Sequence, residues 1–305
     1  GLCAALLVAL VPSYISRSVA GSYDNEGVAI FAIVNVFYTY VKVLNSGRLL
    51  WVAAEVAAYL YMVACWGGYT FVINLIPIHV LAMLALGRYS GRLYIAFSPL
   101  VILGTLAAAS VPVVGFNAVR QSEHFGAFFA FGCLQVVAVA RFLRRALAPA
   151  AHARAKWALG VAAAGGLGAV VLLVAGMVLA SPTLGWSGRS LTLLDPTYAS
   201  KHIPIIASVS EHQPPAWTSY IINLHAVTFL VPAGMVAVVS SPSPPGGGEG
   251  RRAPSSAGIF LLLYGVVAVY FSGVMVRLML VLAPAGCCLA GIAVSDALRV
   301  ATASL

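Results

Sequence analysis

Carboxylates are scarce in this 305-residue chain, so those that lie outside apolar runs are the first candidates for chemistry. The chain has 8 Asp and Glu against 17 Lys and Arg. Asp24 and Glu26 are two residues apart, directly before an apolar run. In an extended segment such residues point to the same side, and paired carboxylates bind hard cations such as Mg²⁺ or Mn²⁺. An acidic N-cap for the following helix is an equally good interpretation of Asp24.

A third candidate carboxylate lies far along the chain. Glu211 belongs to the segment Ser-Val-Ser-Glu-His-Gln-Pro at 208–214. Taken alone, it fits an exposed loop carboxylate. If the apolar runs cross a membrane alternately, however, Glu211 falls on the same face as Asp24 and Glu26. A shared site on that face is therefore a hypothesis.

Two arginines and one tryptophan complete the set of candidates. Arg277 lies inside an apolar run, where a charge is costly and often functional, although its side chain could also extend to the interface. A guanidinium there is suited to a diphosphate. Arg17 precedes the acidic pair and either serves a similar purpose or pairs with Asp24. Trp66 lies at a boundary of a run, where the aromatic belt of a membrane protein accounts for it.

The composition dictates which elements position these residues. Apolar residues make up 61% of the chain and charged residues 8%, with a mean hydropathy of +0.98. These values exclude a soluble enzyme, a disordered chain and a nucleic-acid-binding domain. A spanning helix takes ~20 residues, so we expect an all-α, polytopic transmembrane protein of about ten spans, the first one partial. The expected runs are 1–12, 26–44, 49–65, 69–86, 93–114, 125–143, 157–180, 219–240, 257–281 and 285–300, with a break at Pro284 and Gly286.

The basic residues predict the orientation. Alternate assignment of sides places twelve Lys and Arg on one face and four on the other, and the richer face is expected to be cytoplasmic. The long segment 181–218 then lies on the opposite face as a partly ordered loop. Segment 241–256 is rich in Pro, Gly and Ser and is expected to be a flexible cytoplasmic loop. We take 1–305 as one transmembrane domain, incomplete at both ends.

The motifs around these residues resemble a known family. The stretch from Ser16 to Glu26 resembles the second acidic motif of the catalytic subunit of eukaryotic oligosaccharyltransferase, and 208–214 resembles its SVSE motif. Segments 66–69 (Trp-Gly-Gly-Tyr) and 273–278 (Gly-Val-Met-Val-Arg-Leu) are also similar to it. The likeness runs from about Ser13 to the last apolar run.

The resemblance implies a fold, a reaction and a set of roles. It implies a type C glycosyltransferase-like transmembrane domain that transfers a preassembled oligosaccharide from dolichyl diphosphate to Asn of Asn-X-Ser/Thr sequons. Asp24 and Glu26 would bind Mn²⁺ or Mg²⁺, and Arg17 would support catalysis. The remaining roles are acceptor binding and catalysis by Glu211, acceptor binding by Ser208, and donor binding by Arg277 and Trp66.

The resemblance also implies partners and a location. We expect a multi-pass protein of the endoplasmic reticulum membrane with a luminal active site, other oligosaccharyltransferase subunits, and contacts with membrane lipid, the translocon and the ribosome. The family's first acidic motif and its soluble C-terminal domain are missing from the sequence. Two alternatives remain open: a polyprenyl-phosphate-sugar-dependent glycosyltransferase that acts on a lipid-linked glycan, and a membrane transporter.

Overall fold

A computed structural model describes residues 1–180, 201–240 and 254–303, and the described residues are helical without any strand. This confirms the all-α class. The structural elements are α1 (Leu2–Leu10), α2 (Pro12–Ser18), α3 (Asn25–Ser46), α4 (Leu49–Cys65), α5 (Tyr69–Ala85), α6 (Gly91–Ser110), α7 (Asn117–Arg120), η1 (Ser122–His124), α8 (Phe125–Ala146), α9 (Pro149–Ala180), α12 (Pro204–Ala207), η3 (Ser210–His212), α13 (Trp217–Leu224), α14 (Val227–Ser240), α15 (Ser256–Val274), η4 (Val276–Leu278) and α16 (Met279–Ala303).

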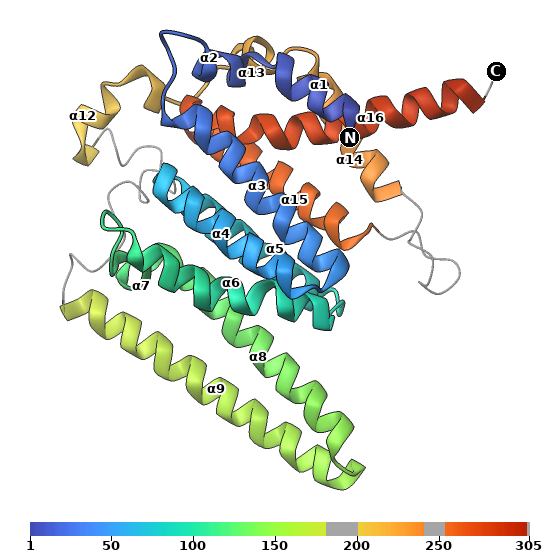
Figure 1. Cartoon of the computed structure of the whole chain (residues 1–305). Coiled ribbons are helices and arrows are strands. Elements are labelled where there is room, and N and C mark those ends of the chain that lie inside the picture. The colour runs from blue at the N-terminus through green and yellow to red at the C-terminus, as the bar shows by residue number, and fades with distance from the viewer. Residues whose placement is uncertain (181–200, 241–253, 304–305) are drawn as a thin grey trace.

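Helix α3 is the central element, because it packs on α4, α6 and α15. Asp24 caps its N-terminus, and Gly47 ends it in the left-handed conformation (φ 66°) that glycine adopts without strain. Its buried face carries Phe37, whose ring lies 5.0 Å from that of Phe260 and 4.8 Å from that of Tyr264 in edge-to-face geometry. In Figure 1, α3 to α6 run side by side across the molecule.

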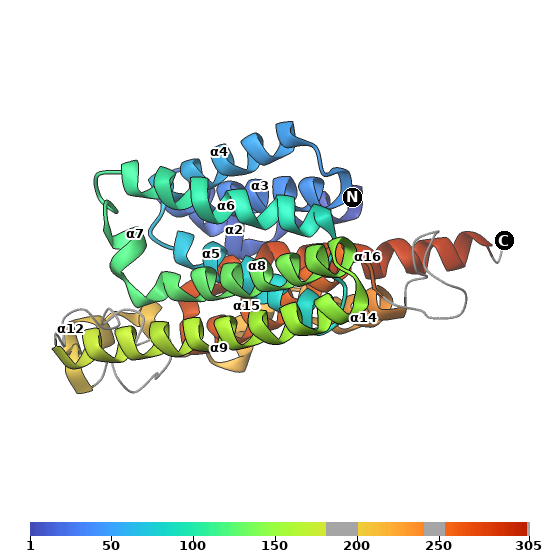
Figure 2. The same ribbon diagram turned by 90° about the horizontal axis from the view of Figure 1, so that it is seen from below.

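Helices α8 and α9 form the edge of the bundle. They pack against each other at the lower side of Figure 1, and the view in Figure 2 again shows the two helices side by side. Most of α8 is not buried: its buried residues are Ala127, Ala130 and Leu134. An apolar helix that leaves so much side-chain surface open is suited to lipid or to a neighbouring helix.

The described residues contain five helices long and apolar enough to cross a membrane: α3, α6, η1 with α8, α15, and η4 with α16. A sixth span results if α13 and α14 count as one. Helices α4 and α5 are shorter apolar helices. The expected runs are therefore helical, and the count of about ten spans stays a prediction.

The structure differs from the expected runs at two places. Run 219–240 is not one straight helix, because α13 and α14 are bent by 87° at His225, which has a positive φ of 48°. The break expected at Pro284 and Gly286 is wrong: both residues are buried inside α16. Proline inside a helix removes a backbone hydrogen bond and crowds the preceding turn, but packed neighbouring helices make it tolerable in membrane bundles, and α16 continues through Pro284. The real break is at Met275, whose extended backbone (φ −150°, ψ 127°) separates α15 from η4.

Basic residues gather at one end of the bundle. Arg92 donates to the carbonyl of Asn45 at 2.7 Å, and Arg88 donates to that of Pro254 at 2.6 Å. These contacts bring the ends of α3, α5 and α6 and the start of α15 together. The N-terminus of α3, with Glu26, is ~30 Å away by the rise of the helix. The two ends of the bundle therefore differ in character, as the sequence predicts.

Candidate functional site

Glu26 is the centre of a charged cluster at the N-terminal end of α3. It lies in the first turn of the helix and is completely buried. Its Oε2 lies 3.2 Å from Nε of Arg17, and its Oε1 accepts a short hydrogen bond from Nε of Arg277. Each carboxylate oxygen therefore forms an ion pair with a guanidinium group from another part of the chain, but only Oε1 accepts a hydrogen bond.

Local sequence brings Arg17 to this place. Helix α2 begins with Pro12 at its first position, which suits the fixed φ of proline, and Arg17 lies in its last turn. The chain then turns back at Gly21 (φ 89°) and enters α3. Gly27 allows the close approach, because a Cβ there would be only 2.8 Å from the carbonyl oxygen of Arg17.

Glu211 joins the same cluster from a distant segment. Its Oε1 accepts a hydrogen bond of 2.8 Å from Nη2 of Arg17, so Arg17 bridges Glu26 and Glu211. The Glu211 side chain remains 42% exposed. Of the three acids expected to share a site, Glu26 and Glu211 are brought together through Arg17, and Arg277 joins them. Asp24 takes no part in these ion pairs, and Arg17 pairs with Glu26 and Glu211 in place of Asp24.

Arg277 is held at the break between α15 and α16, at the start of the apolar segment that η4 and α16 form. It lies in η4, and its side chain is 32% exposed. Beside it, the backbone N–H of Val276 donates to the carbonyl of Gln213 at 3.0 Å. This bond attaches the segment of Glu211 to the segment of Arg277. The roles of Gln213 and Gly27 could not be inferred from the sequence. Gln213 acts through its backbone carbonyl, which every residue type has, and Gly27 acts through the close approach that its missing side chain allows.

Asp24 and Glu26 do not point the same way. Asp24 has the extended backbone of an N-cap, accepts from the N–H of Asn25 at 2.6 Å and is exposed, whereas Glu26 is already helical and turns inward. Because α3 already begins at Asn25, Glu26 is helical, and the side-chain alternation of an extended segment does not apply to Asp24 and Glu26. The N-cap interpretation of Asp24 is confirmed.

This geometry does not fit a divalent ion held by Asp24 and Glu26 together. The described residues contain no group of three or more His, Cys, Asp or Glu side chains placed to hold a metal. Glu26 is buried with its oxygens on arginines, so only Asp24 offers an accessible carboxylate of the pair.

Trp66 and Ser208 lie outside the ion-paired cluster. Trp66 follows α4, is half-buried, and packs against the core with its ring over Gly68. The hydroxyl of Ser208 donates to the carbonyl of Ile205 at 2.8 Å and closes a local turn. Their proposed contacts with donor and acceptor stay predictions.

Two histidines that lie within the apolar runs differ in their surroundings. His79 is fully buried and has both ring nitrogens paired, with the hydroxyl of Tyr40 at 2.8 Å and the carbonyl of Ser256 at 3.0 Å. His225 is not a core histidine, since it is exposed at the bend between α13 and α14.

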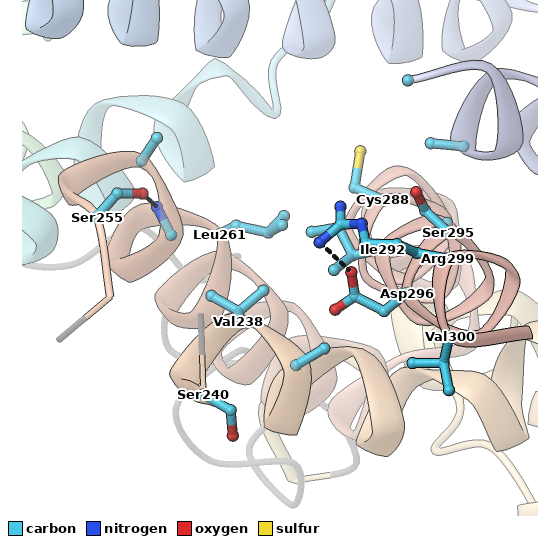
Figure 3. Close-up of a pocket in the computed structure, with 16 residues that line it drawn as sticks. Val238, Ser240, Ser255, Leu261, Cys288, Ile292, Ser295, Asp296, Arg299 and Val300 are labelled. Atoms are coloured by element: carbon cyan, nitrogen blue, oxygen red, sulfur yellow. Dashed lines mark hydrogen bonds and ion pairs between the residues drawn. The ribbon is translucent and has the colours of Figure 1, made fainter. Parts of the chain in front are cut away.

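A cavity of about 850 Å³ lies between α1, α14, α15 and α16, away from the charged cluster. Figure 3 shows its mixed lining, with an ion pair of 3.5 Å between Asp296 and Arg299. None of the predicted site residues lines it.

Fold and site together define a multi-pass helical membrane protein with an ion-paired cluster of two arginines and two glutamates at one end of its bundle. Such a cluster is able to hold one acidic and one basic ligand group side by side. The model of the family "Oligosaccharyl transferase STT3, N-terminal" matches residues 1–290. The chain therefore belongs to the STT3 oligosaccharyl transferase family, as the resemblance predicts.

Relatives with known names support this assignment. The chain is 57% identical to the "Dolichyl-diphosphooligosaccharide--protein glycosyltransferase subunit STT3A" of Oryza sativa subsp. japonica over 308 residues, with 100% of the chain and 37% of the relative covered. It is 48% identical to subunit STT3 of Dictyostelium discoideum, with 98% and 40% covered. The chain thus spans well under half the length of these relatives.

The fold matches a solved structure as well. The archaeal oligosaccharyltransferase AglB from Archaeoglobus fulgidus, in complex with an inhibitory peptide and a dolichol-phosphate, superposes with a TM-score of 0.70 over 99% of this chain and 37% of that chain, at 16% sequence identity. This likeness confirms the type C glycosyltransferase-like fold predicted for the transmembrane domain.

Proposed function

We propose that the chain forms the transmembrane catalytic part of an oligosaccharyltransferase. The complete protein transfers a preassembled oligosaccharide from dolichyl diphosphate to Asn in Asn-X-Ser/Thr sequons. The observation that carries the proposal is the chain of ion pairs Arg277–Glu26–Arg17–Glu211, because it joins residues suited to the donor and to the acceptor in one cluster. Family membership and the names of the relatives support the reaction.

The acceptor needs a carboxylate. A carboxamide nitrogen is a poor nucleophile, since its lone pair is delocalised into the carbonyl group. A carboxylate that accepts from the amide N–H groups orients the nitrogen and weakens this delocalisation. Glu211 fits the role, because Arg17 fixes one of its oxygens while the side chain stays partly exposed. Ser208, three residues before it, is the proposed second contact.

The donor needs cations where charge develops on the departing diphosphate. Arg277 binds Glu26 through Nε, and none of the described residues occupies its Nη groups. These two groups form the edge that binds a phosphate. Nitrogen attack at the anomeric carbon then expels the diphosphate with inversion. Trp66 is proposed to contact the lipid-linked donor at the same end of the bundle.

Metal binding is proposed with a changed set of ligands. Mn²⁺ or Mg²⁺ would supply further positive charge for the leaving group. Asp24 is the accessible carboxylate of the acidic pair and would hold the ion, with the partly exposed Glu211 as the other acid of the cluster that solvent reaches.

The location and the partners are also proposed from the family. We infer a multi-pass protein of the endoplasmic reticulum membrane with the Glu26 cluster facing the lumen, in a complex with other oligosaccharyltransferase subunits. Contacts with the translocon and the ribosome are expected at the opposite, basic end. Membrane lipid surrounds the apolar surface.

Glu211→Gln tests the proposed function. The complete protein, in its native complex, is supplied with lipid-linked oligosaccharide, an Asn-X-Thr peptide and Mn²⁺. We expect glycopeptide from the wild type and a loss of roughly 10²–10³ in rate in Glu211→Gln, because the amide loses a charged acceptor. Asp296→Asn, at a partly exposed carboxylate that lines the cavity outside the cluster, is the matched control and should retain the wild-type rate. No glycopeptide from an intact wild-type complex would exclude the reaction.

A further inference from the structure

We propose that Glu26 is a positioning residue that holds Arg17 and Arg277 in place, and that it does not bind the metal ion. The inference rests on the proposed function and assigns different roles to two acids of its site. It separates two acids that the spacing Asp-Asn-Glu puts together: Asp24 faces ligands, and Glu26 faces the protein.

The first argument is access. Glu26 has no exposed surface: its Oε1 accepts a hydrogen bond from Arg277, and its Oε2 faces Nε of Arg17 at 3.2 Å as an ion pair without a hydrogen bond. A metal ligand must place an oxygen ~2.0–2.6 Å from an ion that enters from solvent. An ion on Glu26 would have to displace Arg17 or Arg277 from a buried carboxylate, which would leave a guanidinium without its counter-charge.

The second argument is electrostatic. Arg17 and Arg277 approach the same carboxylate, and two cations at such a distance repel each other unless an anion lies between them. Glu26 supplies that anion from the first turn of α3, where backbone N–H groups also favour a negative charge. The pairing thus makes it possible for two arginines to share one small site.

The third argument is geometric. Of the two arginines that Glu26 binds, one also binds the proposed acceptor contact, and the other is the proposed donor contact. Arg17 continues to Glu211, the proposed acceptor contact, and Arg277 lies in the break next to the carbonyl of Gln213. One buried carboxylate therefore fixes the distance between the acceptor contact and the donor contact. Asp24 cannot replace it, because its side chain is exposed and caps α3.

The test measures metal affinity and donor affinity separately, in the complete protein within its complex. Mn²⁺ binding is followed by electron paramagnetic resonance, and kcat and KM are measured for the lipid-linked donor. For Glu26→Gln we expect Mn²⁺ affinity within about twofold of wild type and a donor KM raised roughly tenfold or more, since a misplaced Arg277 loses charged hydrogen bonds. For Asp24→Asn we expect the opposite pattern in metal affinity, a loss of roughly tenfold or more.

A double variant tests whether Glu26 acts through Arg277. Arg277→Gln alone should raise the donor KM. Adding Glu26→Gln should raise it by no more than about twofold further, because Glu26 then has no Arg277 guanidinium group to position. Should Glu26→Gln prevent assembly, Glu26→Asp replaces it. This variant keeps the charge but is one methylene shorter. It should leave the Mn²⁺ affinity near the wild-type value and raise the donor KM less than Glu26→Gln does.

Two results would overturn the inference: a Mn²⁺ affinity that falls in Glu26→Gln or Glu26→Asp as much as in Asp24→Asn, or effects of Glu26→Gln and Arg277→Gln on donor KM that multiply in full. Failure of the proposed function looks different. In that case the wild-type complex yields no glycopeptide at all, while the Mn²⁺ titrations still report which of Asp24 and Glu26 binds the ion.

Discussion

At the scale of single residues, the site depends on one missing methyl group. Gly27 lets the end of α2 approach the first turn of α3, and a Cβ in its place would be 2.8 Å from a backbone oxygen of Arg17. Backbone cannot move aside as a flexible side chain does. The position of Arg17, and through it that of Glu211, is therefore sensitive to a residue that touches neither substrate.

Gly27→Ala is expected to lower transferase activity roughly 10- to 100-fold, because displacements well under 1 Å already misalign reacting groups. Activity is measured as glycopeptide formation by the complete complex. Gly91→Ala is the control, since a Cβ at Gly91 meets nothing within 4 Å, and it should be silent. Full activity in Gly27→Ala would show that the α2–α3 approach does not set the geometry of the cluster.

The residues that could be predicted at this scale are those whose type is unusual for their surroundings. Arg277 and Glu211 are conspicuous in a chain that is 8% charged, and both lie in the cluster. The orientation of Asp24 and Glu26 could not be predicted, because it depends on the residue at which α3 begins. One residue earlier or later exchanges which carboxylate faces inward.

At the scale of helices, small residues control how closely α16 packs on its neighbours. A Cβ at Gly234 in α14 would lie 2.1 Å from the carbonyl oxygen of Leu289 in α16. A Cβ at Gly291 would lie 2.7 Å from the backbone nitrogen of Ala4 in α1. Such backbone contact between helices is typical of membrane bundles.

Gly234→Ala should therefore destabilise the bundle by about 1–3 kcal/mol or more, because α14 and α16 must separate. The matched control is Gly132→Ala in α8, where a Cβ meets nothing within 4 Å. It should be neutral or stabilising by up to ~1 kcal/mol, from helix propensity. Thermal unfolding of the detergent-solubilised complex measures both. Equal melting temperatures for the two variants would contradict the close crossing.

Helix content was predictable and helix ends were not. Each apolar run marks a helix, because apolar composition reports burial in lipid or protein. The break at Met275 lies in the run Val-Met-Val-Arg-Leu, which contains no Gly or Pro after Gly273. Tertiary contacts cause it: Val276 donates to Gln213, and Arg277 reaches Glu26. Pro284, which reads as a break, lies where α16 tolerates it.

At the scale of the whole molecule, the two ends of the bundle predict a topology. One end holds Arg88, between α5 and α6, and Arg92 of α6, and the other holds the Glu26 cluster. Positive residues favour the cytoplasmic side, so we expect the cluster in the lumen.

Single cysteines test this orientation in sealed microsomes, after the native cysteines of the complete protein, including the five free ones of this chain, are replaced. With a membrane-impermeant maleimide, Ser46→Cys at the basic end should react at once. Ser22→Cys, next to the cluster, should react only after the membrane is permeabilised. Both positions are exposed. The reverse pattern of labelling would place the basic end in the lumen.

The cluster has a consequence for how the protein is made. Glu26 and Arg277 are 251 residues apart in the chain, so at ribosomal rates of ~5–20 residues per second Glu26 is synthesised ~10–50 s before its partner. During that interval, Arg17 is the one guanidinium partner of Glu26 in the cluster that already exists, and the partner of Oε1 is still to be made. We therefore expect the cluster to close only when the last helices have been inserted.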